Sequence, residues 1–418
     1  MPIRSRATAA LLLASLVPAA CGTKPSESTA PSSAASVVPS VAEPSVSAAG
    51  GLPVAASNDL YYPSADAIAA AAPGQVIHSV EIRADEGTRA WFVVYGSTGL
   101  DGKPVAVSGL IVTPEQPPAE GGYPVVAWAH GTTGIADDCA PSKSGILGIP
   151  DFVRALAAQG YVVTATDYEG LGTDGIHPYL IGRSEGHSVL DSIGAAIRLP
   201  QAHAGDQAVA IGLSQGGHAA LWAAQLKPTY AADLPLLGVF AASPPIDLVA
   251  WETWAYEQAG LGIVEAAAAP VLLFGVWNAV YDVPLSFLTD AGRSSALAGR
   301  EACGPTPFGL TPYSSDPAEI AEWRALLVGN SPGASMTDVP IRVVSPEDDE
   351  AVFYDSQVAG VQAMCAIGDT VELWSIGGGH EASIASPGAW DEAQTWISDR
   401  FAGVAVVSTC SASATLAP

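Results

Sequence analysis

The pattern of hydrophobic and polar positions predicts strands first, and an alternation of strands and helices afterwards. Three strand-like runs come early, at residues 75–83, 91–97 and 105–113. Gly99 and the Asp101-Gly102 pair indicate a turn between the second and third runs. Turn residues between two strand-like runs favour a hairpin, so we expect an antiparallel start.

Beyond residue 123, short continuous apolar runs alternate with segments of helical spacing. The runs typical of strands buried on both faces are 123–129, 161–166, 208–212, 236–242, 341–345 and 371–375. Helical spacing occurs at 151–159, 185–199, 215–227 and 390–401. Pro200 and Pro228 are expected to stop the middle two helices. This alternation predicts the α/β class, with a mostly parallel central sheet flanked by helices.

The alternation lapses between about residues 247 and 340. This stretch is rich in Ala and Leu, and its aromatic side chains include Trp251, Trp254, Tyr256, Phe274, Trp277, Tyr281 and Phe287. Its apolar segment 270–281 is shorter than the ~20 residues that a membrane-spanning helix needs. We interpret the stretch as a helical cap insertion that forms an apolar substrate pocket. Helices that only add structure are the alternative.

The N-terminal segment has the composition of an export signal followed by a linker. Arg4 and Arg6 precede an apolar run at 7–20 that ends in small residues before Cys21. We therefore expect residues 1–21 to be a lipoprotein-type signal with Cys21 as the lipidated residue, although Pro18 stands where Leu is usual. Ordinary cleavage and free secretion is the alternative. Residues 22–55 are expected to be a disordered Ser/Pro/Ala-rich tether, and 56–418 the folded domain.

Composition and charge exclude several classes of partner. Only 14% of the 418 residues are charged and 49% are hydrophobic, so most of the chain must fold. The formal net charge is −26, and the few Lys and Arg residues form no cluster. Nucleic-acid binding and electrostatic docking on anionic lipid both need clustered cations. We therefore expect no nucleic-acid partner, and membrane attachment only through Cys21. We also expect a small-molecule or lipid ester substrate and a monomer, although the charge does not bear on the oligomeric state.

The cysteines indicate disulfides and not a metal site. Setting Cys21 aside leaves Cys139, Cys303, Cys365 and Cys410. An even number in an exported chain predicts two disulfides. The sequence has no C-x-x-C pair and no His at ligand spacing from these cysteines, so we expect no metal.

The segment 212–216, Gly-Leu-Ser-Gln-Gly, matches the G-x-S-x-G pattern. A predicted buried strand precedes it and a helical segment follows it, which is the setting of the nucleophile elbow in an α/β-hydrolase fold. Small glycines allow a strained turn that holds the hydroxyl above the sheet edge. We therefore predict that Ser214 is a catalytic nucleophile. An accidental Gly-Ser turn is the alternative.

A nucleophilic serine needs a base and an orienting acid, and in this fold the order along the chain is Ser, acid, His. His380 lies in a glycine-rich loop directly after the last predicted strand, so we predict that it is the base. The acid should follow the strand at 341–345, where the loop carries Glu347, Asp348, Asp349 and Glu350. The spacing from the strand and the apolar Val352 shortly after favour Asp349, with Asp348 as the alternative.

Acyl transfer also needs donors for the tetrahedral oxyanion. One is expected to be the backbone N–H of Gln215, directly after the nucleophile. The other is expected in the loop after the strand at 123–129, from Gly131, Thr132 or Thr133. His130 at the start of this loop is interpreted as fixing the loop, and His218 as a packing or capping residue of the helix after Ser214.

Several motifs together resemble the secretory lipase family, which includes fungal lipase A-type enzymes. They are W-A-H-G-T-T-G at 128–134, C-A-P-S at 139–142, D-Y-E-G-L-G at 167–172, H-P-Y at 177–179 and G-L-S-Q-G-G at 212–217. The resemblance spans about residues 60–410. It implies an α/β-hydrolase with a helical cap that hydrolyses acylglycerols or other esters without a cofactor. It also implies the disulfides Cys139–Cys303 and Cys365–Cys410.

The main hypothesis is therefore a secreted or lipid-anchored lipase or carboxylesterase that uses Ser214, His380 and Asp349. A peptidase or amidase with the same triad is a second hypothesis, because both reactions use the same groups. A non-catalytic binding protein that retains the fold is a third.

Overall fold

The computed structural model describes residues 52–304, 306–309 and 311–410. The predicted export signal, Cys21 and the predicted tether up to residue 51 lie outside the described residues. The chain contacts the folded body somewhat before residue 56, the predicted start of the domain. The backbone N–H of Arg83 donates to the Pro53 carbonyl at 2.7 Å. Gly145 packs so closely that an added Cβ would lie 2.0 Å from the Val54 oxygen.

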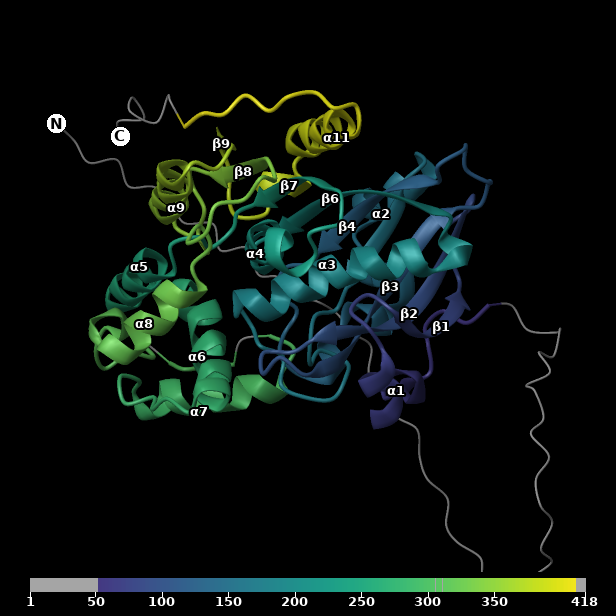
Figure 1. Cartoon of the computed structure of the whole chain (residues 1–418). Coiled ribbons are helices and arrows are strands. Elements are labelled where there is room, and N and C mark those ends of the chain that lie inside the picture. The colour runs from purple at the N-terminus through teal and green to yellow at the C-terminus, as the bar shows by residue number, and fades with distance from the viewer. Residues whose placement is uncertain (1–51, 305, 310, 411–418) are drawn as a thin grey trace, which may run out of the picture. The chain divides into compact units, whose positions relative to one another are not determined.

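The strands of this part of the chain form one nine-stranded sheet in the order β1-β2-β3-β5-β4-β6-β7-β8-β9 (Figure 1). They are β1 Val76–Ile82, β2 Thr88–Thr98, β3 Pro104–Pro114, β4 Tyr123–Ala129, β5 Val162–Thr166, β6 Ala204–Leu213, β7 Leu236–Ala242, β8 Ile341–Pro346 and β9 Val371–Ile376. β1, β2 and β3 pair antiparallel, as β3 does with β5, and the pairs from β5 to β9 are parallel. The predicted α/β class, with its antiparallel start, is confirmed.

Helices cover both faces of the sheet, because its central strands are apolar on both sides. In β4, Val125 and Ala127 face one buried cluster, whereas Val126 and Trp128 face another. The body helices are α1 Ala65–Ala70, α2 Asp151–Ala158, α3 Gly182–Arg198, α4 Gln215–Tyr230, α9 Tyr354–Ile367, α10 Ala382–Ala385 and α11 Pro387–Phe401. α3, α4 and α9 contribute to the first cluster, and α2 and α11 contribute to the second. The central strands are therefore anchored from both sides.

The helix after Ser214 does not stop at Pro228, so that prediction is wrong. α4 continues to Tyr230. A proline within a helix removes the N–H that would bond the carbonyl four residues earlier, here that of Ala224. The Thr337 hydroxyl donates to this carbonyl at 2.7 Å. The carbonyl thus keeps a partner, and the helix tolerates the proline. By contrast, α3 does end before Pro200, at Arg198.

The chain between β7 and β8 is helical, with α5 Leu248–Gly260, α6 Ala268–Tyr281, α7 Asp290–Ala298 and α8 Ala321–Asn330. We call residues 247–340 the insertion. It has its own buried cluster, in which Trp277 and Trp323 stack at 6.3 Å and Phe274 packs against Phe287. Tyr179, from the loop before α3, belongs to the same cluster. The insertion is therefore joined to the body by apolar packing, and its helices gather on one side of the sheet (Figure 1).

Two disulfides are present, and both have the pairings that the family resemblance implied. Cys139–Cys303 joins the loop after β4 to the insertion, and Cys365–Cys410 joins α9 to the C-terminal segment. Among the described residues, no helix is long and apolar enough to cross a membrane.

Helices α6 and α7 touch at their backbones, which gives a test of the insertion's packing. A Cβ added to Gly275 in α6 would lie 2.0 Å from the Ala296 carbonyl oxygen, whereas one added to Gly260 in α5 would meet no atom within 4 Å. We expect Gly275→Ala to lower the free energy of unfolding by about 1–3 kcal/mol through overpacking. Gly260→Ala should leave it unchanged or raise it slightly. Thermal denaturation checks both; equal melting temperatures for the two variants would contradict this packing.

Candidate active site

Ser214 sits in a sharp turn between the end of β6 at Leu213 and the start of α4 at Gln215. Its backbone has φ 56° and ψ −117°, a conformation that residues other than glycine rarely adopt. The Ser214 N–H donates to the Ala242 carbonyl at 2.8 Å, which ties the turn to the end of β7. The turn is held although its conformation is unfavourable, as is common at functional sites.

Close backbone approach explains the glycines around Ser214. A Cβ added to Gly216 would lie 1.9 Å from the Ala129 oxygen, at the end of β4. One added to Gly212 would lie 2.2 Å from the Gly216 oxygen. No side chain fits at either position, so the first turn of α4 packs directly on the strand ends and Ser214 lies at the carboxyl edge of the sheet.

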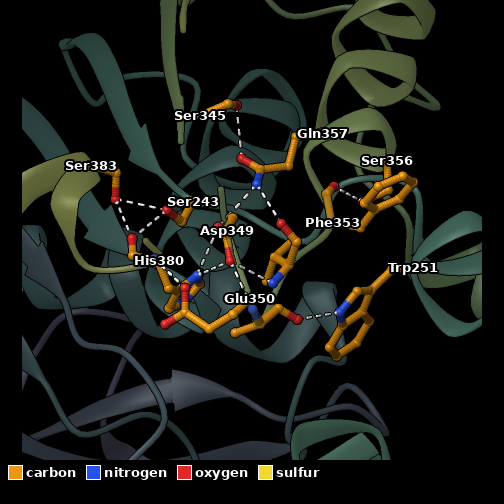
Figure 2. Close-up of polar contacts among 12 residues, drawn as sticks. Ser243, Trp251, Ser345, Asp349, Glu350, Phe353, Ser356, Gln357, His380 and Ser383 are labelled. Atoms are coloured by element: carbon orange, nitrogen blue, oxygen red, sulfur yellow. Dashed lines mark hydrogen bonds and ion pairs between the residues drawn. The ribbon is translucent and has the colours of Figure 1, made fainter. Parts of the chain in front are cut away.

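His380 and Asp349 lie in contact, in the loops after β9 and β8 (Figure 2). Nδ1 of His380 is 2.9 Å from both carboxylate oxygens of Asp349. The Asp349 side chain is fully buried and that of His380 is 13% exposed. Because a carboxylate only accepts, Nδ1 carries a proton, and in the neutral tautomer with this proton Nε2 has the lone pair. Asp348, the alternative acid, is exposed.

Several groups hold Asp349 in place. Its Oδ1 accepts the backbone N–H groups of Ala351 and Val352, at 2.9 Å and 2.8 Å. Its Oδ2 accepts from Nε2 of Gln357 at 3.2 Å, and the Gln357 side-chain oxygen accepts from the Ser345 hydroxyl at 2.8 Å. Sequence reasoning missed Gln357, because it lies on α9, for which the hydrophobic pattern gave no prediction.

The main chain of His380 is fixed by three side chains. Ser243 and Ser383 were missed from the sequence, and Glu350 was considered only as a candidate acid. Ser243 donates to its carbonyl oxygen at 2.7 Å and Ser383 at 3.0 Å. The His380 N–H donates to Glu350 Oε2 at 3.0 Å. Ser243 directly follows Ala242, the residue whose carbonyl accepts from Ser214. The elbow and the histidine loop are therefore linked through the end of β7.

The Ser214 hydroxyl and Nε2 of His380 form no hydrogen bond with any residue in the described part of the chain. The structure thus brings Asp349 and His380 together, but the Ser214–His380 hydrogen bond is not made. Such bonds are often long in unliganded enzymes and tighten in the substrate complex.

The loop after β4 runs beside the elbow. A Cβ added to Gly131 would lie 3.9 Å from the Ser214 Cβ. The Thr132 hydroxyl lies 2.7 Å from the Tyr179 hydroxyl. The Thr133 hydroxyl is buried and has no hydrogen-bond partner among the described residues. Tyr168 donates to the His130 carbonyl at 2.9 Å, which fixes the start of the loop.

The imidazoles behind this loop are neutral. Burial lowers the pKa of His130 to about 4, and burial also lowers the pKa of His177. His177 Nδ1 faces the Glu169 carbonyl and its Nε2 accepts from the Gln215 side chain at 2.8 Å. Both imidazoles therefore stay uncharged at neutral pH, and both ring nitrogens of His177 already have hydrogen-bond partners. Among the described residues, no group of three or more His, Cys, Asp and Glu side chains is arranged to hold a metal ion.

The model of the secretory lipase family matches residues 150–270. This range contains the elbow at Ser214 and the buried helix α3. Over this range the chain is similar to the secretory lipase family. The acid and base loops lie outside the matched range, so their assignment depends on the geometry described above.

Relatives of this chain include fungal lipases. Lipase A of Moesziomyces aphidis is 30% identical over 223 residues, which cover 49% of this chain and 46% of that protein, so less than half of the relative's length is matched. Lipase 6 of Candida albicans is 24% identical, with 85% of this chain and 83% of the relative covered. Candida antarctica lipase A has a similar structure, with a TM-score of 0.68, 20% identity and coverage of 84% and 87%. This likeness shows that the fold is that of an α/β-hydrolase.

The strain at residue 214 can be measured from the stability of two variants. Glycine adopts the observed φ and ψ without penalty, but it raises the conformational entropy of the unfolded chain. We expect Ser214→Gly to be about 0.5–2 kcal/mol more stable than Ser214→Ala, because relief of strain exceeds the entropy cost. Denaturant unfolding of the two variants checks this. A Gly variant less stable than the Ala variant would mean that the turn is not strained.

Proposed function

We propose that this protein is a member of the secretory lipase family and an extracellular serine hydrolase that cleaves carboxylic esters, including acylglycerols, through an acyl-enzyme. One observation carries the proposal. Ser214 is held in a strained turn at the carboxyl edge of the sheet, and a buried Asp349–His380 pair is tied to the same strand end. Nucleophile, base and orienting acid are the parts that acyl transfer requires.

The proposed mechanism assigns one role to each group. The Ser214 oxygen attacks the ester carbonyl carbon, and its proton passes to Nε2 of His380. Asp349 keeps Nδ1 protonated and stabilises the imidazolium that forms. The tetrahedral intermediate collapses and the alcohol leaves with the proton from His380. Water, activated by the same imidazole, then attacks the acyl carbon and releases the acid and Ser214.

The developing oxyanion is proposed to bind the backbone N–H of Gln215 and an N–H of the loop at Gly131, Thr132 and Thr133. The position of Gly131 next to Ser214 supports this placement. The energy of such donors depends on their being fixed before the charge develops.

The apolar insertion supports an acyl-chain substrate, because its buried cluster extends to Tyr179 and Val352 beside the two functional loops. We propose that the insertion is a cap over the substrate site. The signal-like N-terminus supports export, and we propose that Cys21 carries a lipid anchor.

Removal of the nucleophile tests the proposal directly. We expect Ser214→Ala to lower kcat on p-nitrophenyl esters and glycerides by roughly 10⁴-fold or more, because no other group can form the acyl-enzyme. Wild type should be labelled at Ser214 by a fluorophosphonate, and the variant should not. Acyl-chain lengths from butyrate to oleate, and aminoacyl amides, complete the panel. Faster cleavage of amides than of esters would support a peptidase. Absence of labelling in the wild type would support a non-catalytic binding protein.

Neighbouring carboxylates give a matched test of the acid. Asp349→Asn should favour the wrong histidine tautomer and lower kcat by roughly 10³–10⁴-fold, as in other triads. Asp348→Asn, an equal change at the adjacent exposed residue, should retain wild-type kcat. Steady-state kinetics on one soluble ester decides between them. If the two variants lost activity equally, Asp349 would not be the orienting acid.

A further inference from the structure

Glu185 is a buried carboxylate that the proposed mechanism does not use. It lies in the first turn of α3, and its side chain is fully buried. Its Oε1 accepts the backbone N–H of Leu180 at 2.9 Å and Nε2 of Gln215 at 2.8 Å. Its Oε2 lies 3.0 Å from Nδ1 of His218. A buried carboxyl group is unfavourable unless hydrogen-bond partners surround it, and here both of its oxygens have such partners.

The hydrogen bonds fix the position of its histidine partner. Nε2 of His218 is 2.8 Å from the Asn330 carbonyl oxygen, so this nitrogen carries a proton. Nδ1 faces Glu185, whose other oxygen already receives two N–H groups. The buried ring is therefore held between Glu185 and Asn330, with a hydrogen-bond partner at each nitrogen. His218 packs inside the protein, as expected from the sequence, and it joins Glu185 to the end of α8.

Both side chains that Glu185 binds on α4 belong to the turn that starts at the nucleophile. Gln215 directly follows Ser214, and the His218 N–H donates to the Ser214 carbonyl at 3.0 Å. Nε2 of Gln215 also lies 2.8 Å from Nε2 of His177. The reversed amide would turn its oxygen toward the carboxylate of Glu185, so Glu185 sets the orientation of this side chain.

The remaining partner of Glu185 is Leu180, which lies next to the segment that contacts the other side of the proposed oxyanion site. Leu180 has φ 53°, which is unfavourable for leucine, and its N–H is held by Glu185. The preceding residue, Tyr179, places its hydroxyl 2.7 Å from the Thr132 hydroxyl. One carboxylate oxygen thus joins Gln215 to the segment that contacts the loop at Thr132.

We propose that Glu185 is a positioning residue for the oxyanion site. It fixes the first turn of α4 on one side and the segment of Tyr179 on the other. The distance between the Gln215 N–H and the donor loop at 131–133 is thereby kept constant. This inference rests on the proposed function. A fixed geometry of oxyanion donors stabilises charge that is present only in the transition state, so its loss should lower kcat and leave KM little changed.

The test uses Glu185→Ala and Glu185→Gln in the full chain, with active enzyme counted by complete fluorophosphonate labelling. Loss of one oxyanion donor typically costs ~10²–10³ in rate, and misplacement costs less. We expect Glu185→Ala to lower kcat per labelled site by about tenfold or more, with KM within about threefold of wild type. Glu185→Gln should restore kcat to within about threefold, because the amide can accept from Leu180 and Gln215 and donate to a neutral His218.

Asp191 provides a matched control on the same helix. It is also a buried carboxylate, and it accepts from the hydroxyls of Ser97 and Tyr230 at 2.6 Å and 2.7 Å, away from the elbow. Asp191→Ala should lower the melting temperature but leave kcat per labelled site unchanged. A Glu185→Ala variant that behaved in the same way would overturn the inference, because its role would then be only structural.

A second variant keeps the test decisive if Glu185→Ala does not fold. Gln215→Ala retains the backbone N–H and removes the side chain through which Glu185 holds it. It should show the same fall in kcat per labelled site, and full retention of kcat would overturn the inference. A wild type that neither hydrolysed esters nor accepted the probe would instead overturn the proposed function itself.

Discussion

The arrangement of the site depends on how closely the first turn of α4 approaches the end of β4. At Gly216 the two backbones leave no room for a side chain, since an added Cβ would meet the Ala129 oxygen at 1.9 Å. This contact fixes where α4 begins, and it forces Ser214 into a turn with positive φ. It also brings the loop after β4 beside the nucleophile. A larger residue at position 216 would push the Gln215 N–H away from the loop at 131–133, the two places proposed to bind the oxyanion.

The strain that this packing imposes is distributed around the site and held by buried polar groups. Tyr168, Leu180, Ser214 and Ser243 all have positive φ, and all lie in the loops at the carboxyl edge. Each is held by a hydrogen bond that the rest of the fold supplies. Leu180 donates to Glu185, the Tyr168 hydroxyl donates to the His130 carbonyl, and the Ser243 hydroxyl donates to the His380 carbonyl. Buried carboxylates are unfavourable alone, but here their donors come from several loops and fix those loops relative to one another.

The sequence predicts the features that depend on local pattern. Continuous apolar runs locate the parallel strands because those strands are buried on both faces, and the elbow is predicted because its glycines, strand and helix are adjacent in the chain. Asp349 is chosen among four carboxylates by its spacing from the strand. The failures concern contacts between distant residues. The sequence near Pro228 does not indicate that Thr337 will donate to the Ala224 carbonyl, which the proline leaves without its helical partner. Likewise, the partners Gln357 and Glu185 lie on helices whose role appears only when the loops are assembled.

The insertion is fastened to the site at two points that differ in chemistry. On α5, the Trp251 indole N–H donates to the Ala351 carbonyl at 2.8 Å, in the loop that carries Asp349 (Figure 2). At the end of α8, the Asn330 carbonyl accepts from His218 and from the Trp222 indole at 3.0 Å, both on α4. A shift of α5 would therefore act on Asp349, whereas a shift of α8 would act on α4 through the hydrogen bonds of His218 and Trp222. Because coupling between parts of a protein passes through such packed and hydrogen-bonded contacts, these two anchors are where the position of the insertion and the geometry of the site depend on each other.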